Sequence, residues 1–340
     1  MRSTERLWLP LCYVLAACSG ADPAPATDAG IAPGSNAPLR LNEIQLLATH
    51  NSYHVETPDS TVPDWHYSHA PLPTQLSEQG VRGFELDTHF DTATGVLSVH
   101  HVPMLDEGTT CELLPECLAL LKTWSDAHPG HHTLFLQIES KDADVGEKPD
   151  YAAYADALDA ALVTAFTRDR IVTPADIQGK ASTLREAVLK NGWPSVESTR
   201  GKLFVYLDNR AELHDAYTRG GSDLHGRIAF PSSQVDEPIA ALVISNDPTD
   251  PATRAAVKQG FMVRTRADSV PLPTDLEAQR SAALASGAQI VSTDFPVAQT
   301  GVAAAFELVG GTPSRCNPVT SPKGCTARDV ENPDTLTDAR

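Results

Sequence analysis

The chain alternates between short apolar runs of β-prone residues and longer segments whose apolar positions recur at helical spacing. Candidate strands lie at about 44–49, 83–88, 133–139, 203–208, 227–230, 241–246, 261–266 and 289–293. Helical character is clearest at 149–166, 183–192, 251–260 and 275–288. Because strands that alternate with helices form parallel sheets, the pattern predicts an α/β fold, a single (β/α)8 TIM-like barrel of regular or irregular form.

A ninth apolar run, at 96–101, follows the 83–88 strand too closely for a helical crossover, which needs a dozen or more residues. We expect it to be either a hairpin return or an irregular barrel strand. In both cases it would keep His101 beside Glu85 and Asp87.

The first 18 residues have the features of an export signal. Arg2 and Arg6 flank a charged start, and the apolar stretch LWLPLCYVLAA is too short to span a bilayer and ends in small residues. Leu-Ala-Ala-Cys at its end resembles a bacterial lipobox, which would make Cys18 the lipidated mature terminus. The alternative is an ordinary signal peptide cut near Ala17. We therefore expect a cell-envelope lipoprotein or a secreted protein.

The remaining chain divides into three predicted parts. Residues 19–38 are rich in Ala, Pro, Gly, Asp and Ser, as in a flexible linker. Residues 39–325 would form the barrel, because a single barrel domain takes about 250 residues. Residues 326–340 are expected to be a frayed polar tail. The barrel is expected to act as a monomer.

The net charge of −18 excludes some partners. Nucleic-acid binding depends on Lys and Arg that neutralise phosphates, so no nucleic-acid partner is expected. Adsorption to anionic lipid by bulk electrostatics is disfavoured for the same reason. A negative charge of this size also serves simply to keep an exported protein in solution.

Four cysteines lie outside the presumed leader: Cys111, Cys117, Cys316 and Cys325. They permit three disulfide pairings, of which the local one joins Cys111 to Cys117 and Cys316 to Cys325. A zinc site is the rival, but neither interval has the usual short zinc spacing and no histidine lies between them.

Several strand candidates end in residues that do not belong in a core. His50 and Asn51 follow the first, Glu85 and Asp87 lie in the second, and Glu139 ends the third. A parallel barrel presents catalytic groups in this way at its carboxyl-terminal face. Asn, Asp and Glu oxygens suit a hard cation such as Ca²⁺ or Mg²⁺, and nearby histidines suit proton transfer. The pattern indicates metal-assisted attack on a phosphate ester.

The order of these segments resembles a known family. His50-Asn51, then QLSEQGVRGFELD at 75–87, VHH at 99–101 and QIE at 137–139 are similar to the catalytic domain of the secreted, calcium-dependent bacterial phosphatidylinositol-specific phospholipases C. The likeness covers most of 40–300. It implies a phosphodiesterase that cleaves phosphatidylinositol-type lipids to diacylglycerol and a cyclic inositol phosphate.

The resemblance also implies roles for single residues. His50 would stabilise charge on the phosphate, and His101 would protonate the departing alcohol. His100 is the alternative candidate for this proton donor, because the sequence has VHH where the family more usually has VYH. Calcium ligands would be Asn51, Glu85, Asp87 and Glu139, the last also a candidate base toward the inositol 2-hydroxyl. Weaker candidates for substrate contacts are Lys141, Arg264, Arg266 and Asp294.

Two rival functions remain open. Glycerophosphodiester phosphodiesterases also combine a strand-end histidine, an E-x-D pair and a later histidine, but their first motif is typically His-Arg-Gly rather than His50-Asn51-Ser52. A non-catalytic, lipid-anchored binding protein is the other rival, and the retention of both histidines and all four expected ligands disfavours it.

Overall fold

The structure, a computed structural model, describes residues 37–57, 60–142, 149–208, 211–221, 223–299, 302 and 304–337. The predicted export signal, Cys18 and the linker up to residue 36 lie outside these residues. Within the described ranges, no helix is long and apolar enough to cross a membrane.

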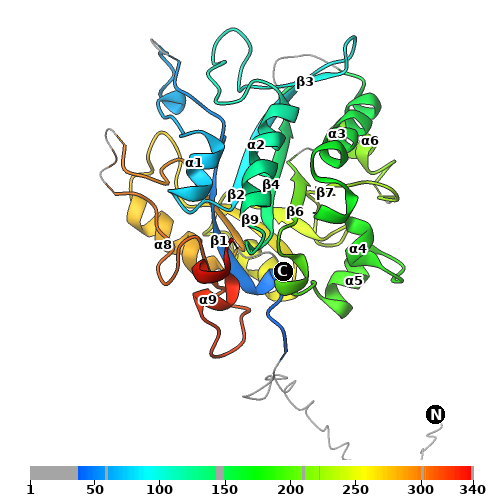
Figure 1. The fold of residues 1–340 in the computed structure, drawn as a ribbon, viewed down its shortest axis with the longest axis vertical. Coiled ribbons are helices and arrows are strands. Elements are labelled where there is room, and N and C mark those ends of the chain that lie inside the picture. The colour runs from blue at the N-terminus through cyan, green and yellow to red at the C-terminus, as the bar shows by residue number, and fades with distance from the viewer. Residues whose placement is uncertain are drawn as a thin grey trace, which may run out of the picture. The chain divides into compact units, whose positions relative to one another are not determined.

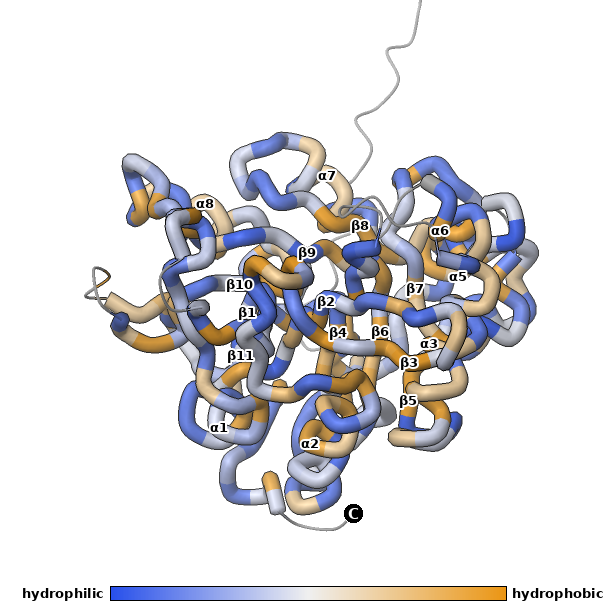
Figure 2. The backbone as a smooth tube through the Cα atoms, turned by 90° about the horizontal axis from the view of Figure 1, so that it is seen from above, coloured by the Kyte–Doolittle hydropathy of each residue, from blue (hydrophilic) through white to orange (hydrophobic). Residues whose placement is uncertain are grey.

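The described chain forms a barrel of parallel strands surrounded by helices (Figure 1, Figure 2). Its strands are β1 (Ile44–Thr49), β2 (Gly83–Asp91), β4 (Leu134–Ser140), β6 (Leu203–Leu207), β7 (Phe230–Pro231), β8 (Leu242–Ile244), β9 (Met262–Arg266) and β10 (Ile290–Thr293). Each strand except β7 pairs in parallel with the next, and β10 pairs with β1. Between β7 and β8 the link is a single bridge from Ser232 to Leu242, so the barrel is irregular there. The predicted fold is confirmed.

Three further strands extend the sheet. β3 (Val96–Val99) runs antiparallel to β2, so the ninth apolar run is the hairpin return. β5 (Ile171–Val172) pairs with the start of β6, and β11 (Ser314–Cys316) runs antiparallel to β1.

Helices cover the outside of the barrel: α1 (Leu72–Ser77), α2 (Leu114–Ala127), α3 (Tyr151–Phe166), α4 (Pro174–Gln178), α5 (Leu184–Asn191), α6 (Ala211–Tyr217), α7 (Pro251–Gln259), α8 (Leu276–Ser286) and α9 (Ala327–Val330). Single-turn 3₁₀ helices lie at Leu41–Glu43, Pro63–Trp65, Arg168–Arg170, Glu197–Thr199 and Pro333–Thr335. The four helices predicted from the sequence are α3, α5, α7 and α8. Each begins after an Asp or Thr whose side chain accepts hydrogen bonds from backbone N–H groups of the first turn.

The end of the chain differs from the expected frayed tail. Val330 in α9 is fully buried, and the carboxylate of Glu331 receives hydrogen bonds from the guanidinium of Arg82 and the backbone N–H of His132. Burial disfavours the charged carboxylate, but Arg82 overrides it and lowers the pKa of Glu331 to about 2. The tail prediction was therefore wrong for residues 326–336, which pack against the barrel, while 338–340 lie outside the described residues.

Both local disulfides are present, which confirms the predicted pairing. Cys111 is bonded to Cys117 and Cys316 to Cys325. Such bonds persist in oxidising compartments, as expected for an exported protein.

Candidate active site

The neighbouring strands β2 and β4 bring the predicted acidic residues together. Glu85 and Asp87 are two apart on β2, so their side chains share the inner face of the sheet. Asp87 is the direct register partner of Glu139 on β4. As a result, one carboxylate oxygen from each of the three residues lies within 4.8 Å of the others.

Burial and repulsion by neighbouring carboxylates disfavour the ionised forms of Glu85 and Glu139 when no cation is bound. Burial, with Asp87 beside it, raises the pKa of Glu85 to about 7, although the nearby Arg264 opposes the shift. Burial and the charge of Asp87 likewise raise the pKa of Glu139 to about 9. Three carboxylates in these positions would be stabilised by a bound positive ion.

Asn51 directly precedes Ser52, whose backbone N–H donates to the carbonyl oxygen of Glu85 at 2.9 Å. Asn51 follows β1 with a φ of 44°, a left-handed conformation that Asn adopts more readily than most residues. The side-chain Oδ1 of Asn51 and the Oδ1 of Asp87 are buried without a hydrogen-bond partner among the described residues. Because buried oxygens normally have partners, these two fit a site for a hard cation such as calcium.

Two protein cations also contact the cluster. The guanidinium of Arg264, on β9, lies 2.7 Å from a carboxylate oxygen of Glu85. The ammonium of Lys141 lies 2.8 Å from Glu139 and 3.7 Å from Asp87. Both side chains therefore hold the acidic residues in place.

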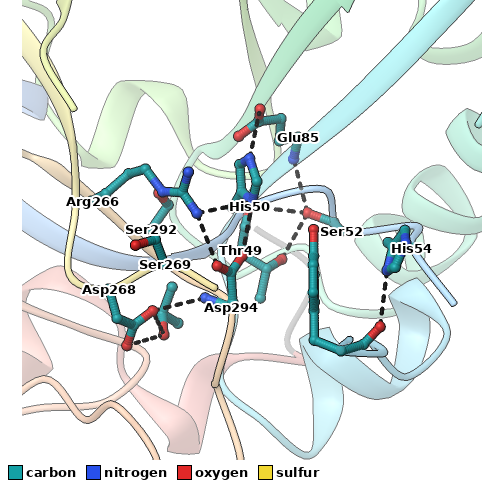
Figure 3. Close-up of polar contacts among 12 residues, drawn as sticks. Thr49, His50, Ser52, His54, Glu85, Arg266, Asp268, Ser269, Ser292 and Asp294 are labelled. Carbon is teal, nitrogen blue, oxygen red and sulfur yellow. Dashed lines mark hydrogen bonds and ion pairs between the residues drawn. The ribbon is translucent and has the colours of Figure 1, made fainter. Parts of the chain in front are cut away.

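His50 is oriented by a buried carboxylate at the end of β10 (Figure 3). Its Nδ1 lies 2.8 Å from Asp294, and Arg266 contacts the other oxygen of that carboxylate at 2.8 Å. Burial, together with the positive charges of Arg266 and Arg264, holds the pKa of His50 well below its usual range. In a neutral imidazole, a proton on Nδ1 would be donated to Asp294, and Nε2 lies 3.9 Å from a carboxylate oxygen of Glu85.

His101 is held by a second carboxylate. Its Nδ1 lies 2.9 Å from Asp106, which also bonds His54 Nε2 at 3.0 Å. Burial disfavours the charge on Asp106, but hydrogen bonds from His101 and His54 keep the pKa of its carboxyl well below the usual range. His100 has no such partner among the described residues and instead stacks on His89, with ring centroids 4.1 Å apart.

A calcium-dependent family matches this chain over most of its length. The model described as "Phosphoinositide phospholipase C, Ca2+-dependent" matches residues 39–100 and 96–318. The chain belongs to this family. Its members are phosphoric diester hydrolases of the phosphatidylinositol-specific phospholipase C type.

Solved structures of related phospholipases C share the fold. The calcium-dependent enzyme from Streptomyces antibioticus has a TM-score of 0.54 and 20% identity, over 76% of this chain and 95% of that one. The calcium-dependent enzyme from a Gram-negative Pseudomonas species has a TM-score of 0.57 and 18% identity, over 82% of this chain and 95% of that one. No curated protein matches the chain.

All four expected substrate contacts of this phospholipase C-like chain are engaged with protein groups. Arg264 and Asp294 are almost fully buried, and they contact Glu85 and His50. Arg266 is partly exposed, and its Nε has no hydrogen-bond partner among the described residues. Of the four weaker candidates, Arg266 has the most exposed side chain, at 19%, and Lys141 follows at 15%.

Sequence reasoning missed three polar residues around the histidines. His54 and Asp106 form the chain of hydrogen bonds behind His101, and the hydroxyl of Tyr53 donates to Asp87 at 2.8 Å. His54 ends the same THNSYH segment as His50, which is the one signal that could have drawn attention to it.

Proposed function

We propose that this protein cleaves phosphatidylinositol-type lipids to diacylglycerol and a cyclic inositol phosphate, with calcium as its cofactor. The observation that carries the proposal is the buried oxygen cluster beside His50, together with a second histidine, His101, that a carboxylate orients. Membership of the calcium-dependent family supports the same reaction class.

The ligands for the cation would be Asn51, Glu85, Asp87 and Glu139. Their oxygens match the preference of calcium, and the unpartnered Oδ1 atoms of Asn51 and Asp87 would gain a partner. When bound there, calcium would neutralise charge on the phosphate and lower the pKa of the attacking hydroxyl.

The attacking group would be the inositol 2-hydroxyl, whose oxygen forms a bond to phosphorus while the bond to the diacylglycerol oxygen breaks. Neutral His50 would accept the hydroxyl proton at Nε2, with Asp294 stabilising the imidazolium that results. This role differs from the charge stabilisation expected from the sequence, because a neutral imidazole brings no charge of its own. Arg266 would supply that charge, and Glu139 remains a candidate base in place of His50.

His101 would donate a proton to the leaving diacylglycerol oxygen. Asp106 supports this role because a carboxylate that accepts from Nδ1–H leaves the Nε2 proton of a charged imidazole available for donation. His100 is less suited, since its ring is stacked on His89.

The two rival functions are less well supported. The family match concerns phosphoinositide phospholipases C, not glycerophosphodiester phosphodiesterases. A non-catalytic binding protein would have no need for two histidines that are each oriented by a buried carboxylate.

The test is release of diacylglycerol from phosphatidylinositol by the purified protein, with calcium and with excess chelator. Glycerophosphoinositol and phosphatidylcholine serve as control substrates. Calcium-dependent release from phosphatidylinositol alone supports the proposal. Cleavage of glycerophosphodiesters in its place, or full activity in chelator, contradicts it.

We also propose that the mature protein begins at a lipidated Cys18 and is tethered to the cell envelope. The two disulfides are consistent with export, and the Leu-Ala-Ala-Cys boundary supports lipidation. Several acyl chains would anchor it stably, whereas one would bind only marginally. Mass spectrometry of the mature amino terminus tests this, and an unmodified terminus at another residue would rule it out.

A further inference from the structure

Two histidines share the buried carboxylate of Asp106. Nδ1 of His101 lies 2.9 Å from one of its oxygens, and Nε2 of His54 lies 3.1 and 3.0 Å from the two oxygens. His54 and Asp106 are both fully buried, whereas the side chain of His101 is 21% exposed. Because only His101 can reach a substrate, the buried His54 is a titratable group without an assigned role.

Both ring nitrogens of His54 face hydrogen-bond acceptors. Nε2 faces the carboxylate of Asp106, and Nδ1 lies 2.9 Å from the backbone carbonyl oxygen of Tyr67. Asp106 also accepts from His101 and, at 3.1 Å, from the hydroxyl of Thr57, as an ionised carboxylate does. A neutral imidazole has a single N–H and would leave a lone pair against one of the two acceptors. Only the imidazolium form of His54 donates at both positions.

Two other buried histidines show the contrasting arrangement. His131 and His132 each face a carbonyl oxygen with Nδ1 and a serine hydroxyl with Nε2. Since a hydroxyl can donate to Nε2, a single ring proton satisfies both nitrogens. Burial lowers the pKa of His131 to about 3 and that of His132 to about 4, in line with neutral rings. His54 differs from both in having a carboxylate where they have a hydroxyl.

The surroundings of His54 suit a positive charge. Its ring stacks on that of Tyr67, with centroids 4.5 Å apart and an angle of 28° between the planes. A cation over an aromatic face is attracted by the π electrons. The backbone N–H of His69 donates to the carbonyl oxygen of His54, but burial lowers the pKa of His69 to about 4, so this ring adds no second charge. An imidazolium at position 54 therefore has a counter-ion, Asp106, and an aromatic partner.

Backbone contacts join the segment that carries His54 to the one that carries Asp106. The backbone N–H of Val55 donates to the carbonyl oxygen of Gly108 at 3.0 Å. A side chain at position 108 would collide with the carbonyl oxygen of Val55, so the close approach of the two segments requires glycine. The fold itself therefore holds His54 against Asp106.

We propose that His54 is an imidazolium at neutral pH that balances the charge of Asp106 and thereby makes His101 a stronger acid. An unbalanced carboxylate would stabilise the protonated form of His101 and so weaken it as a proton donor. With the charged ring of His54 6.3 Å from the ring of His101, that proton is held less tightly. His54 is a positioning residue, because it acts through Asp106 and touches no substrate. The catalytic consequence rests on the proposed function, whereas the charge on His54 does not.

Trp65 and His89 also contact His101, and neither depends on His54. The ring of Trp65 meets that of His101 edge-on, with centroids 5.7 Å apart. Nε2 of His89 donates to the backbone carbonyl oxygen of His101 at 3.3 Å, and its Nδ1 lies 3.4 Å from Asp142. A change in the titration of His101 on replacement of His54 would therefore report the loss of the positive charge.

The charge on His54 is tested by nitrogen NMR spectroscopy of the purified chain, isotopically labelled at histidine. The chemical shifts of the two ring nitrogens distinguish an imidazolium from a neutral ring. We expect both nitrogens of His54 to carry a proton at about pH 7.5, one unit above the ordinary histidine pKa of about 6.5. His131 in the same spectrum is the internal control and should give the pattern of a neutral ring. A neutral His54 at this pH would overturn the proposal.

His54→Gln tests the effect on His101. Glutamine is uncharged, but its amide can still donate to Asp106. The midpoint of the NMR titration of His101 should rise by about one pH unit or more, as expected for the loss of a positive charge about 6 Å away. The falling limb of the kcat pH profile should move to higher pH with it. His131→Gln, the same substitution in a buried histidine before β4, is the matched control and should leave the midpoint in place.

A merely structural His54 would give a different result. Its replacement would lower activity without raising the titration midpoint of His101, and that outcome would overturn the proposal. If His54→Gln does not fold, the spectrum of the parent decides the charge of His54 by itself. A charged His54 and a raised His101 midpoint in the variant, in a protein that does not cleave phosphatidylinositol, would refute the proposed function and leave the charge assignment standing.

Discussion

The ammonium of Lys141 lies 2.8 Å from a carboxylate oxygen of Glu139, within the group of oxygens proposed to bind calcium. It also lies 3.7 Å from Asp87. The ammonium of Lys141 thus lies in the same region of negative potential that would attract a metal ion. Calcium binding must then overcome the attraction between Lys141 and its acidic partners.

We therefore expect Lys141→Met to bind calcium at least about tenfold more tightly, because two like charges a few ångströms apart repel by more than 1 kcal/mol even with screening. Isothermal titration calorimetry measures this directly, without turnover. Lys190→Met is the matched control, since Lys190 forms an exposed pair with Glu186 away from the site. Unchanged affinity in Lys141→Met would show that the ammonium leaves the cluster before calcium enters.

The stability of the metal-free protein should fall as the pH rises from about 7 to 9. Burial raises the pKa of Glu85 to about 7 and that of Glu139 to about 9, whereas both groups ionise near about 4.3 in an unfolded chain. Over this range the folded state holds more protons than the unfolded state, so each step up in pH favours unfolding. Between pH 7 and 9 the proton that the folded state keeps on Glu139 corresponds to roughly 3 kcal/mol.

Denaturant unfolding at a series of pH values, in chelator and in calcium, checks this expectation. Calcium should flatten the pH dependence, because it stabilises the ionised carboxylates. Glu139→Gln should remove much of the slope in chelator. A metal-free protein that is equally stable at pH 7 and pH 9 contradicts the assignment.

The strands could be predicted from the sequence because parallel strands buried on both faces read as unbroken apolar runs. The helix α2 was missed, since it begins after Leu113, which offers no side-chain cap. Contacts between residues distant in sequence could not be predicted, for another reason. Asp106 lies 52 residues from His54, and Glu331 lies 249 residues from Arg82. Only the closed barrel brings such groups together, whereas the E-x-D spacing is local and could be read directly.

The buried pair of Arg82 and Glu331 should be important for stability. Glu331→Ala leaves a guanidinium buried without its carboxylate, a change that typically costs about 3–5 kcal/mol. Thermal unfolding measures the loss. Asp334→Ala, which breaks an exposed pair with Arg328 in the same tail, should lower stability by less than about 1 kcal/mol. Equal, small effects of both substitutions would show that the tail adds little to the fold.

Asp106 should act on catalysis through His101. Asp106→Asn keeps the shape of the side chain but removes the charge that stabilises a protonated imidazole, so kcat should fall while KM changes little. The pH profile should shift with it: the falling limb, which reports loss of the acid, should move to lower pH because the imidazolium is less stable without the carboxylate. A fall in kcat with an unshifted profile would make Asp106 merely structural.

The roles of the two histidines can be separated by the leaving group. Removing a general acid typically costs about 10²- to 10⁴-fold, but only when the departing oxygen needs the proton. His101→Ala should therefore lose much activity on a natural lipid, whose alkoxide leaves poorly, and far less on an analogue that releases a nitrophenolate. His50→Ala should reduce both rates alike, since attack on phosphorus is required whatever group departs. Equal losses for His101→Ala on the two substrates would reject its role as the acid, and a rescue seen only with His100→Ala would transfer that role to its neighbour.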